Sequence, residues 1–161
     1  MIRPIAIGTI IFMLSSSQAG IQSPSITVQT YRPEPYEAKT EFDEQWGIRL
    51  SAKNIGPEGL TLCFSQAGGN DINKLLFGTE FYLEVFKDGR WERVPYISDS
   101  IGWDSVAYSI TPDAFTEYEI SWKYIYGALP SGRYRISKSI HNYRSPGDYD
   151  EKLYSLEFEI K

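Results

Sequence analysis

Short runs in which apolar and polar residues alternate recur along most of this chain. Ile48, Leu50 and Ala52 alternate with polar residues, and the same pattern returns at residues 60–65, 117–122 and 156–161. Successive side chains of a strand point to opposite faces of a sheet, so each run predicts a strand with one buried face. No long window shows a helical period. The pattern therefore predicts an all-β protein.

Turn residues divide these runs. Asp88-Gly89 suits both central positions of a type I′ turn and predicts a hairpin over residues 81–97. Residues 70–77 are expected to form at most a short turn of helix. Strands are predicted near residues 25–32, 46–53, 59–65, 79–87, 90–97, 105–110, 116–122, 132–140 and 153–161. About seven to nine short strands without helices between them indicate an antiparallel β-sandwich, and a closed barrel is the alternative.

The N-terminus has the organisation of a signal peptide. Arg3 precedes the apolar residues 5–14, and the small residues Ser17 and Ala19 are placed for cleavage before Gly20. The apolar run is shorter than the roughly 18 residues that a membrane-spanning helix needs. We therefore expect a signal peptide at residues 1–19, one domain at residues 20–161, no transmembrane segment after cleavage, and a secreted or extracytoplasmic location.

Charge and cysteine content exclude several classes of protein. Removing residues 1–19 leaves 15 Lys plus Arg against 21 Asp plus Glu, a net charge of −6. Such acidity argues against nucleic acid as a partner, because phosphates would be repelled. The only cysteine, Cys63, cannot form an internal disulfide and is expected to be a small apolar residue of the interior.

A tyrosine corner is predicted where Leu129-Pro130-Ser131-Gly132 leads into an alternating run. In immunoglobulin-like sandwiches, a tyrosine near the start of the penultimate strand bonds back to the preceding corner. Tyr134 has this position. Ile136 stands where an antibody domain places its second cysteine, so packing is expected in place of a disulfide.

The same region carries a resemblance to a known family. The segment WKYIYGALPSGRYRISK at residues 122–138, with GTEFYLEVFKDGRWERVPY at 78–96 and GLTLCFSQ at 59–66, resembles bacterial immunoglobulin-like domains of extracytoplasmic proteins. The resemblance implies a β-sandwich outside the cytoplasm. It brings no catalytic residue, cofactor or ligand that can be carried over to this chain.

Catalytic chemistry has little support in the sequence. His141 is the only histidine and is expected in a loop, and no nucleophile elbow is present, so a serine triad is not predicted. The acid pairs at residues 117 and 119 and at 157 and 159 fit the polar faces of strands better than a glycosidase site. We therefore predict a protein that is not an enzyme and has no cofactor or metal. Calcium in a loop remains open at two acidic clusters: Asn70, Asp71 and Asn73, or Asp148, Asp150 and Glu151.

Candidate ligand contacts are aromatic residues in segments predicted as loops. Trp103, Tyr143 and Tyr149 lie among Gly, Ser and Asp residues, where a ring could stack on a sugar or pack beneath its own loop. Arg133 and Arg135 share one face of a strand and either bind an anionic partner or protect a sheet edge. Residues 65–77 and 98–105 are the segments in which a function particular to this chain is most expected.

These observations predict a secreted or envelope-associated, non-catalytic binding or structural module. Its partner is expected to be an unknown protein or another component of the cell envelope, recruited through a sheet edge or face. The alternative is a carbohydrate-binding module that uses the loop aromatics.

Overall fold

The computed structural model describes residues 10–13, 26–29, 38–39, 41–70 and 72–161, and the regular structure in these ranges is entirely β-strand. The chain divides into two compact units, residues 1–34 and 35–161. In the first, β1 (Ile10–Met13) pairs antiparallel with β2 (Ile26–Gln29). Most of the predicted signal peptide, residues 1–19, lies outside the described residues, so its cleavage stays a prediction.

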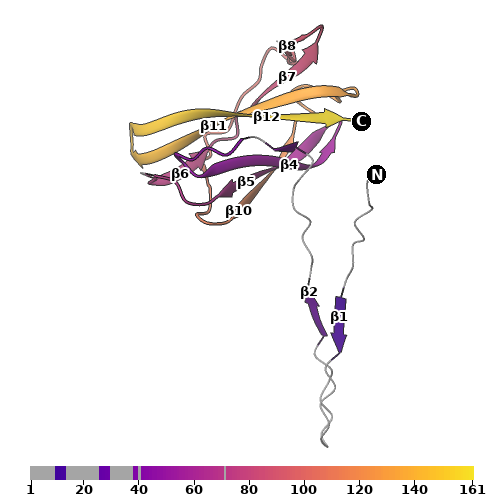
Figure 1. Cartoon of the computed structure of the whole chain (residues 1–161). Helices are drawn as coiled ribbons and strands as arrows, with labels where there is room; N and C mark the ends of the chain where they lie inside the picture. The colour runs from indigo at the N-terminus through magenta and orange to yellow at the C-terminus, as the bar shows by residue number, and fades with distance from the viewer. Residues whose placement is uncertain (1–9, 14–25, 30–37, 40, 71) are drawn as a thin grey trace, which may run out of the picture. The chain divides into compact units, whose positions relative to one another are not determined.

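The second unit consists of two antiparallel sheets (Figure 1). One sheet has the order β10-β5-β4-β3, and the other has the order β8-β7-β11-β6-β9 with β12 paired to the free edge of β11. The strands are β3 (Ala38–Lys39), β4 (Ile48–Gly56), β5 (Gly59–Gln66), β6 (Lys74–Phe77), β7 (Tyr82–Lys87), β8 (Arg90–Arg93), β9 (Tyr108–Ser109), β10 (Phe115–Ser121), β11 (Gly132–Ser145) and β12 (Asp148–Ile160). The predicted all-β sandwich is confirmed, and the closed barrel is wrong.

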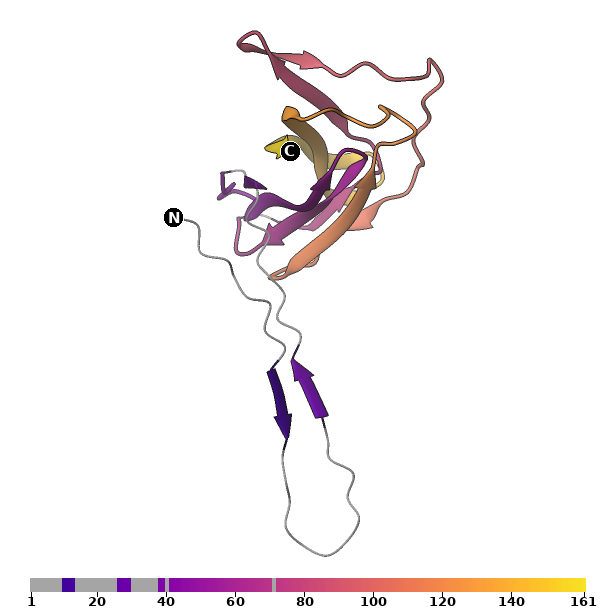
Figure 2. The ribbon, with the colours of Figure 1, turned by 90° about the vertical axis from the view of Figure 1, so that its right-hand side faces the viewer.

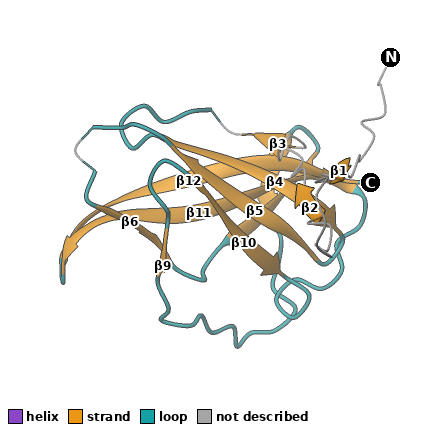
Figure 3. Cartoon of the chain, turned by 90° about the horizontal axis from the view of Figure 1, so that it is seen from below, coloured by secondary structure: helices purple, strands orange, loops and turns teal. Residues whose placement is uncertain are grey.

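β11 organises the larger sheet. It pairs with β12 along its length on one edge, and on the other edge with β7 near its start and β6 near its end. Figure 3 shows β11 and β12 lying across β4, β5 and β10 of the facing sheet. The inward side chains of both sheets meet between these layers, as the alternation predicts.

The core is built from the apolar positions of the alternating runs. Leu50, Phe64, Leu83, Ile136 and Leu156 are completely buried. Each comes from a different strand, so the interior joins both sheets into one hydrophobic cluster. Burial of apolar area is the main favourable term in the stability of such a fold, because each buried side chain is removed from water.

One corner of this core is closed by Tyr134. Its hydroxyl donates a hydrogen bond of 2.9 Å to the carbonyl of Pro130, and its ring stacks on Phe158 with centroids 5.8 Å apart. Trp122, also buried, donates from its indole nitrogen to the carbonyl of Pro57 at 2.8 Å. These bonds tie the β4–β5 turn, through Pro57, and the loop before β11, through Pro130, to the core. Ile136, two residues after Tyr134, is completely buried.

The predicted hairpin at Asp88-Gly89 is present as β7 and β8. Both turn residues have positive φ, 50° at Asp88 and 81° at Gly89, as a type I′ turn requires. Figure 2 shows this hairpin extending away from the packed sheets.

Two segments predicted as a helical turn and as a loop are strands in the structure. Residues 74–77 form β6, with Leu75 and Phe77 buried, where a helical turn was expected. β11 and β12 continue to a tight turn around Gly147, so His141, Tyr143 and Tyr149 lie in strands. At this end of the hairpin both faces of the strands are largely solvated. Apolar and polar residues therefore do not alternate there, and the strand pattern cannot be recognised in the sequence.

Cys63 lies on the outer face of β5 yet is completely buried. The strand register places it between Ser51 of β4 and Glu117 of β10. Lys53 and Glu117 form an ion pair of 2.7 Å between these flanking strands. This ion pair spans the outer face of β5, from β4 to β10.

No helix in the described ranges is long and apolar enough to cross a membrane.

The corner bond predicts a measurable loss of stability when it is removed. Tyr134→Phe keeps the ring stack on Phe158 but leaves the Pro130 carbonyl without its donor, so the free energy of unfolding should fall by about 1 kcal/mol. Urea denaturation measures this change. Tyr124→Phe, at a residue that is 82% exposed, is the matched control and should leave stability unchanged. An equal effect of the two substitutions would contradict the assigned role of the corner.

Candidate binding surfaces

The three aromatic residues predicted to contact a ligand lie in two different places. Trp103 packs edge-on against Phe81, with centroids 5.2 Å apart, and is half-buried. Tyr143 and Tyr149 are direct cross-strand neighbours near the far end of the β11–β12 hairpin. Tyr149 is 48% exposed and its ring lies 4.9 Å from that of His141. The structure therefore brings together the two tyrosines but not Trp103.

Trp103 belongs to a long connection between β8 and β9. Residues 94–107 contain no regular structure and run along the sandwich from one edge of the larger sheet to the other (Figure 2). Most connections in compact domains are much shorter, with a median of about 4 to 6 residues. The Trp103 contact and a hydrogen bond of 3.0 Å from Thr79 to the carbonyl of Asp104 hold this connection in place.

Apolar side chains are exposed where this connection meets the turn after β10. The amide of Ile97 donates a hydrogen bond of 2.9 Å to the carbonyl of Ile125, and the ring of Tyr96 lies 5.2 Å from that of Tyr126. Ile97 is 62% exposed and Tyr124 is 82% exposed. We call Tyr96, Ile97 and Tyr124 the loop surface. Exposed apolar residues that together form a contiguous patch mark protein-interaction sites.

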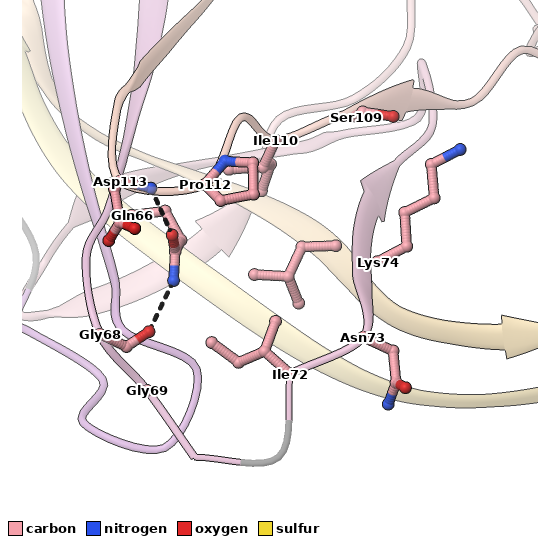
Figure 4. A pocket seen from close by; sticks show the side chains of 11 residues that line it. Gln66, Gly68, Gly69, Ile72, Asn73, Lys74, Ser109, Ile110, Pro112 and Asp113 are labelled. Atoms are coloured by element: carbon pink, nitrogen blue, oxygen red, sulfur yellow. Dashed lines mark hydrogen bonds between the residues drawn. The ribbon is translucent and has the colours of Figure 1, made fainter.

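A pocket of about 440 Å³ opens at another part of the sandwich, between the loop after β5 and the turn before β10. Ile72, Leu75, Ile110 and Pro112 supply its apolar lining. Figure 4 shows Ile72 on one side of the hollow and Ile110 and Pro112 on the other. This places part of the segment at residues 65–77, where a particular function was expected, around a cavity.

Gln66 holds two walls of the pocket in place (Figure 4). Its side-chain oxygen accepts a hydrogen bond of 2.9 Å from the amide of Asp113, and its side-chain nitrogen donates to the carbonyl of Gly68 at 2.7 Å. Gln66 is buried, so these bonds form in a medium where an unpaired amide would be costly. The amide therefore links the loop after β5 to the turn before β10.

Glycines allow the loop after β5 to approach the preceding turn closely. Gly69 has φ of 98°, and a Cβ there would lie 2.3 Å from the terminal methyl of Ile72 and 2.9 Å from the backbone of Trp46. The amide of Asn70 also donates to the carbonyl of Gln45 at 2.8 Å. A larger residue at position 69 would push these segments apart. The pocket wall is therefore built by close backbone packing.

The arginines on the outer face of β11 are neutralised within the domain. Arg133 pairs with Glu157 at 2.5 Å and Arg135 pairs with Glu84 at 2.7 Å. The Arg135 guanidinium also lies over the ring of Trp91, 4.6 Å from its centroid. β11 is an inner strand, so the expected protection of a sheet edge is wrong. The contacts of the two arginines with Glu84 and Trp91 hold the β7–β8 hairpin against β11.

Lys138 is the most unusual charged residue of the interior. It is 1% exposed, donates to the carbonyl of Glu80 at 2.8 Å and also to that of Gly78, and lies over the rings of Phe77 and Tyr118. Burial lowers the pKa of Lys138 to about 8 because the charged form loses its hydration, and the negative charge of Glu80 opposes part of this effect. Lys138 lies on the strand face that the period of two assigns to the interior, but a lysine is rarely buried, so the residue type argued against this position.

A second charged cluster joins the turn before β4 to β12. The Asp43 carboxylate accepts hydrogen bonds from Lys152 at 2.8 Å and from the Tyr154 hydroxyl. Burial alone would raise the pKa of Asp43, but these hydrogen bonds and the positive charge of Lys152 lower it. Burial raises the pKa of Tyr154, and the hydrogen bond to Asp43 and the negative charge of Asp43 raise it further. The cluster is internally paired and stabilises the fold.

Within the described ranges, no three His, Cys, Asp or Glu side chains lie close enough together to hold a metal ion. The second acidic cluster proposed for calcium is not in a loop: Asp148, Asp150 and Glu151 lie in β12, and Arg144 pairs with both aspartates at 2.7 Å. In the first cluster, Asp71 lies outside the described residues and the amide of Asn73 donates to the side chain of Asn142.

Two packed antiparallel sheets with a tyrosine at the corner before the penultimate strand define an immunoglobulin-like sandwich. The profile of a family described as "Bacterial Ig-like domain" matches residues 44–159. The chain therefore belongs to the bacterial immunoglobulin-like domain family. Comparison with curated proteins finds no match, and neither does comparison with solved structures. Domains of this family are typically non-catalytic and usually occur in extracytoplasmic proteins.

Sequence reasoning missed the residues that build the pocket. Gln66 directly follows the strand predicted at residues 59–65, and nothing in the local sequence indicates that its side chain bonds to the backbone of Trp46, Gly68 and Asp113. The sequence signal in this region is the segment at residues 65–77, where a function particular to this chain is expected, and it does not identify the individual residues of the pocket.

The buried amine predicts an alkaline dependence of stability. Lys138 loses its proton near pH 8 in the folded chain but near 10.5 in the unfolded chain, so between these values the unfolded state binds more protons. Stability should therefore rise with pH over this window, by about 1 kcal/mol per pH unit. Buried tyrosines with raised pKa, such as Tyr126, act in the opposite direction above pH 10, so urea denaturation is compared from pH 8 to 9.5.

Lys138→Met should remove this rise, while Lys123→Met, at an exposed lysine, should retain it. Parallel pH profiles for the unchanged chain and Lys138→Met would show that the amine is not held in the buried, poorly hydrated state described.

Proposed function

We propose that the chain acts outside the cytoplasm as a non-catalytic binding module that recruits a protein partner through the loop surface of Tyr96, Ile97 and Tyr124. Membership of the bacterial immunoglobulin-like family supports both the absence of catalysis and the location. The signal-peptide pattern of residues 1–19 supports export.

The observation that carries this proposal is the exposure of Ile97 and Tyr124 on an ordered support. Ile97 is 62% exposed although its amide is held by the carbonyl of Ile125. A loop held in this way loses little conformational freedom on binding, so its apolar area contributes more fully to affinity. Trp103 contacts Phe81, whose ring lies 6.0 Å from that of Tyr126, the residue on which Tyr96 packs.

The loop surface gives a specific expectation for cross-linking in intact cells. A photo-reactive phenylalanine analogue at position 97 should form an adduct with a discrete partner protein, and Tyr124→Asp should reduce that adduct by about tenfold, because a charge in an apolar contact is costly to desolvate. Mass spectrometry of the adduct should show a chain beginning at Gly20.

The matched control places the analogue at position 153, since Leu153 is 61% exposed on the outer face of β12. Equal adducts from positions 97 and 153, or none from position 97, would rule out the loop surface as the site of recruitment.

Carbohydrate binding is a second candidate because Tyr143 and Tyr149 face the same side of the β11–β12 hairpin. Rings exposed side by side on a strand pair can stack on sugar rings. If this site binds polysaccharide, Tyr149→Ala should abolish co-sedimentation with insoluble cell wall, while Trp103→Ala should retain it whenever circular dichroism shows an intact fold. Binding that depends on Trp103 alone would contradict the assignment to the tyrosine pair.

A further inference from the structure

We propose that the pocket beside Gln66 binds a small, uncharged and predominantly apolar molecule. This inference goes beyond the proposed function, because the pocket and the loop surface consist of different residues. The pocket's volume of about 440 Å³ falls within the range of about 300 to 1,000 Å³ that is common for small-molecule sites.

The pocket is formed before any ligand arrives. Gln66 joins the loop after β5 to the turn at Asp113, and the close approach of Gly69 to Trp46 leaves no room for that loop to shift inward. On the opposite wall, the amide of Ile110 donates to the carbonyl of Leu75 at 2.9 Å. Walls held by backbone and buried side-chain bonds do not collapse into the hollow, so little ordering cost remains for a ligand.

The lining selects for apolar chemistry. The aliphatic residues Ile72, Leu75, Ile110 and Pro112 line the hollow. The side chain of Gln66 points toward it but already bonds to Gly68, Trp46 and Asp113. Most of the binding free energy must therefore come from removing apolar ligand surface from water.

Charge and ring content of the described lining argue against two other ligand classes. Lys74 and Asp113 contribute one charge of each sign, so the rim gives no net attraction to an ion. Among the residues that the structure describes, the lining includes no aromatic ring on which a sugar could stack. Ser109 and Asn73 remain at the rim as hydrogen-bonding groups for one polar end of the ligand.

The test is a titration of the full chain, labelled at its Ile and Leu methyl groups, with the uncharged fluorophore N-phenyl-1-naphthylamine, followed by NMR. Saturable shifts are expected at the methyls of Ile72, Leu75 and Ile110. Ser109→Trp should weaken the binding measured at these methyls by at least about tenfold by filling the hollow, and Ile72→Asp should do so by placing a charge in its wall.

Ser100→Trp, which adds the same ring at an exposed position of the β8–β9 connection, is the matched control and should leave the titration unchanged. Two further arms use the anionic 1-anilinonaphthalene-8-sulfonate and N-acetylglucosamine, which should bind more weakly at these methyls. The proposal is overturned if no saturable shift occurs there, if both pocket variants bind as the unchanged chain does, or if the sugar binds more tightly than the fluorophore. Saturable shifts confined to residues of the loop surface would exclude the pocket as the binding site. They would not contradict the proposed recruitment of a protein partner.

Discussion

The pairing of β11 on both of its edges is the constraint on which the rest of the structure depends. β12 covers one edge, while β7 and β6 share the other in succession. The gap between those two short partners is where the chain at Gly78 and Glu80 passes β11, and there Lys138 reaches inward to bond both carbonyls. A buried charge is costly, but here it satisfies backbone groups that no strand partner reaches. The same bend directs the chain past Phe81, which supports the long β8–β9 connection.

The alternation in the sequence was sufficient to predict the sandwich because its longest strands each have one apolar face. Ile48, Leu62 and Leu156 could be assigned to the interior from period alone, and all three are completely buried. β6 could not be found in this way, since four residues are too few to separate a strand from a helical turn. The far end of the β11–β12 hairpin could not be predicted as strand for a different reason. Arg144 and the two aspartates with which it pairs give this end no apolar face.

The candidate sites were less predictable than the fold because they depend on contacts between distant segments. The loop surface exists only because Ile97 and Ile125 share a backbone hydrogen bond, and the pocket exists because Gln66 reaches both Gly68 and Asp113. The local composition around Ile97 and Gln66 does not indicate which distant residues they bond to. Both sites are supported by rigid strands but consist largely of loop and turn residues, the usual division between scaffold and recognition in sandwich folds.

The burial of Cys63 makes its thiol an internal reporter of sheet opening. The thiol lies on β5, between β4 and β10, and β10 is the outermost strand of its sheet. A reagent that modifies thiols can reach the sulfur once β10 and Glu117 separate from β5, without unfolding of the β11–β12 hairpin. Partial opening of this kind has its own free energy, lower than that of global unfolding. With one cysteine in the whole chain, labelling in native buffer that is faster than global unfolding allows reports local opening of this sheet at β5.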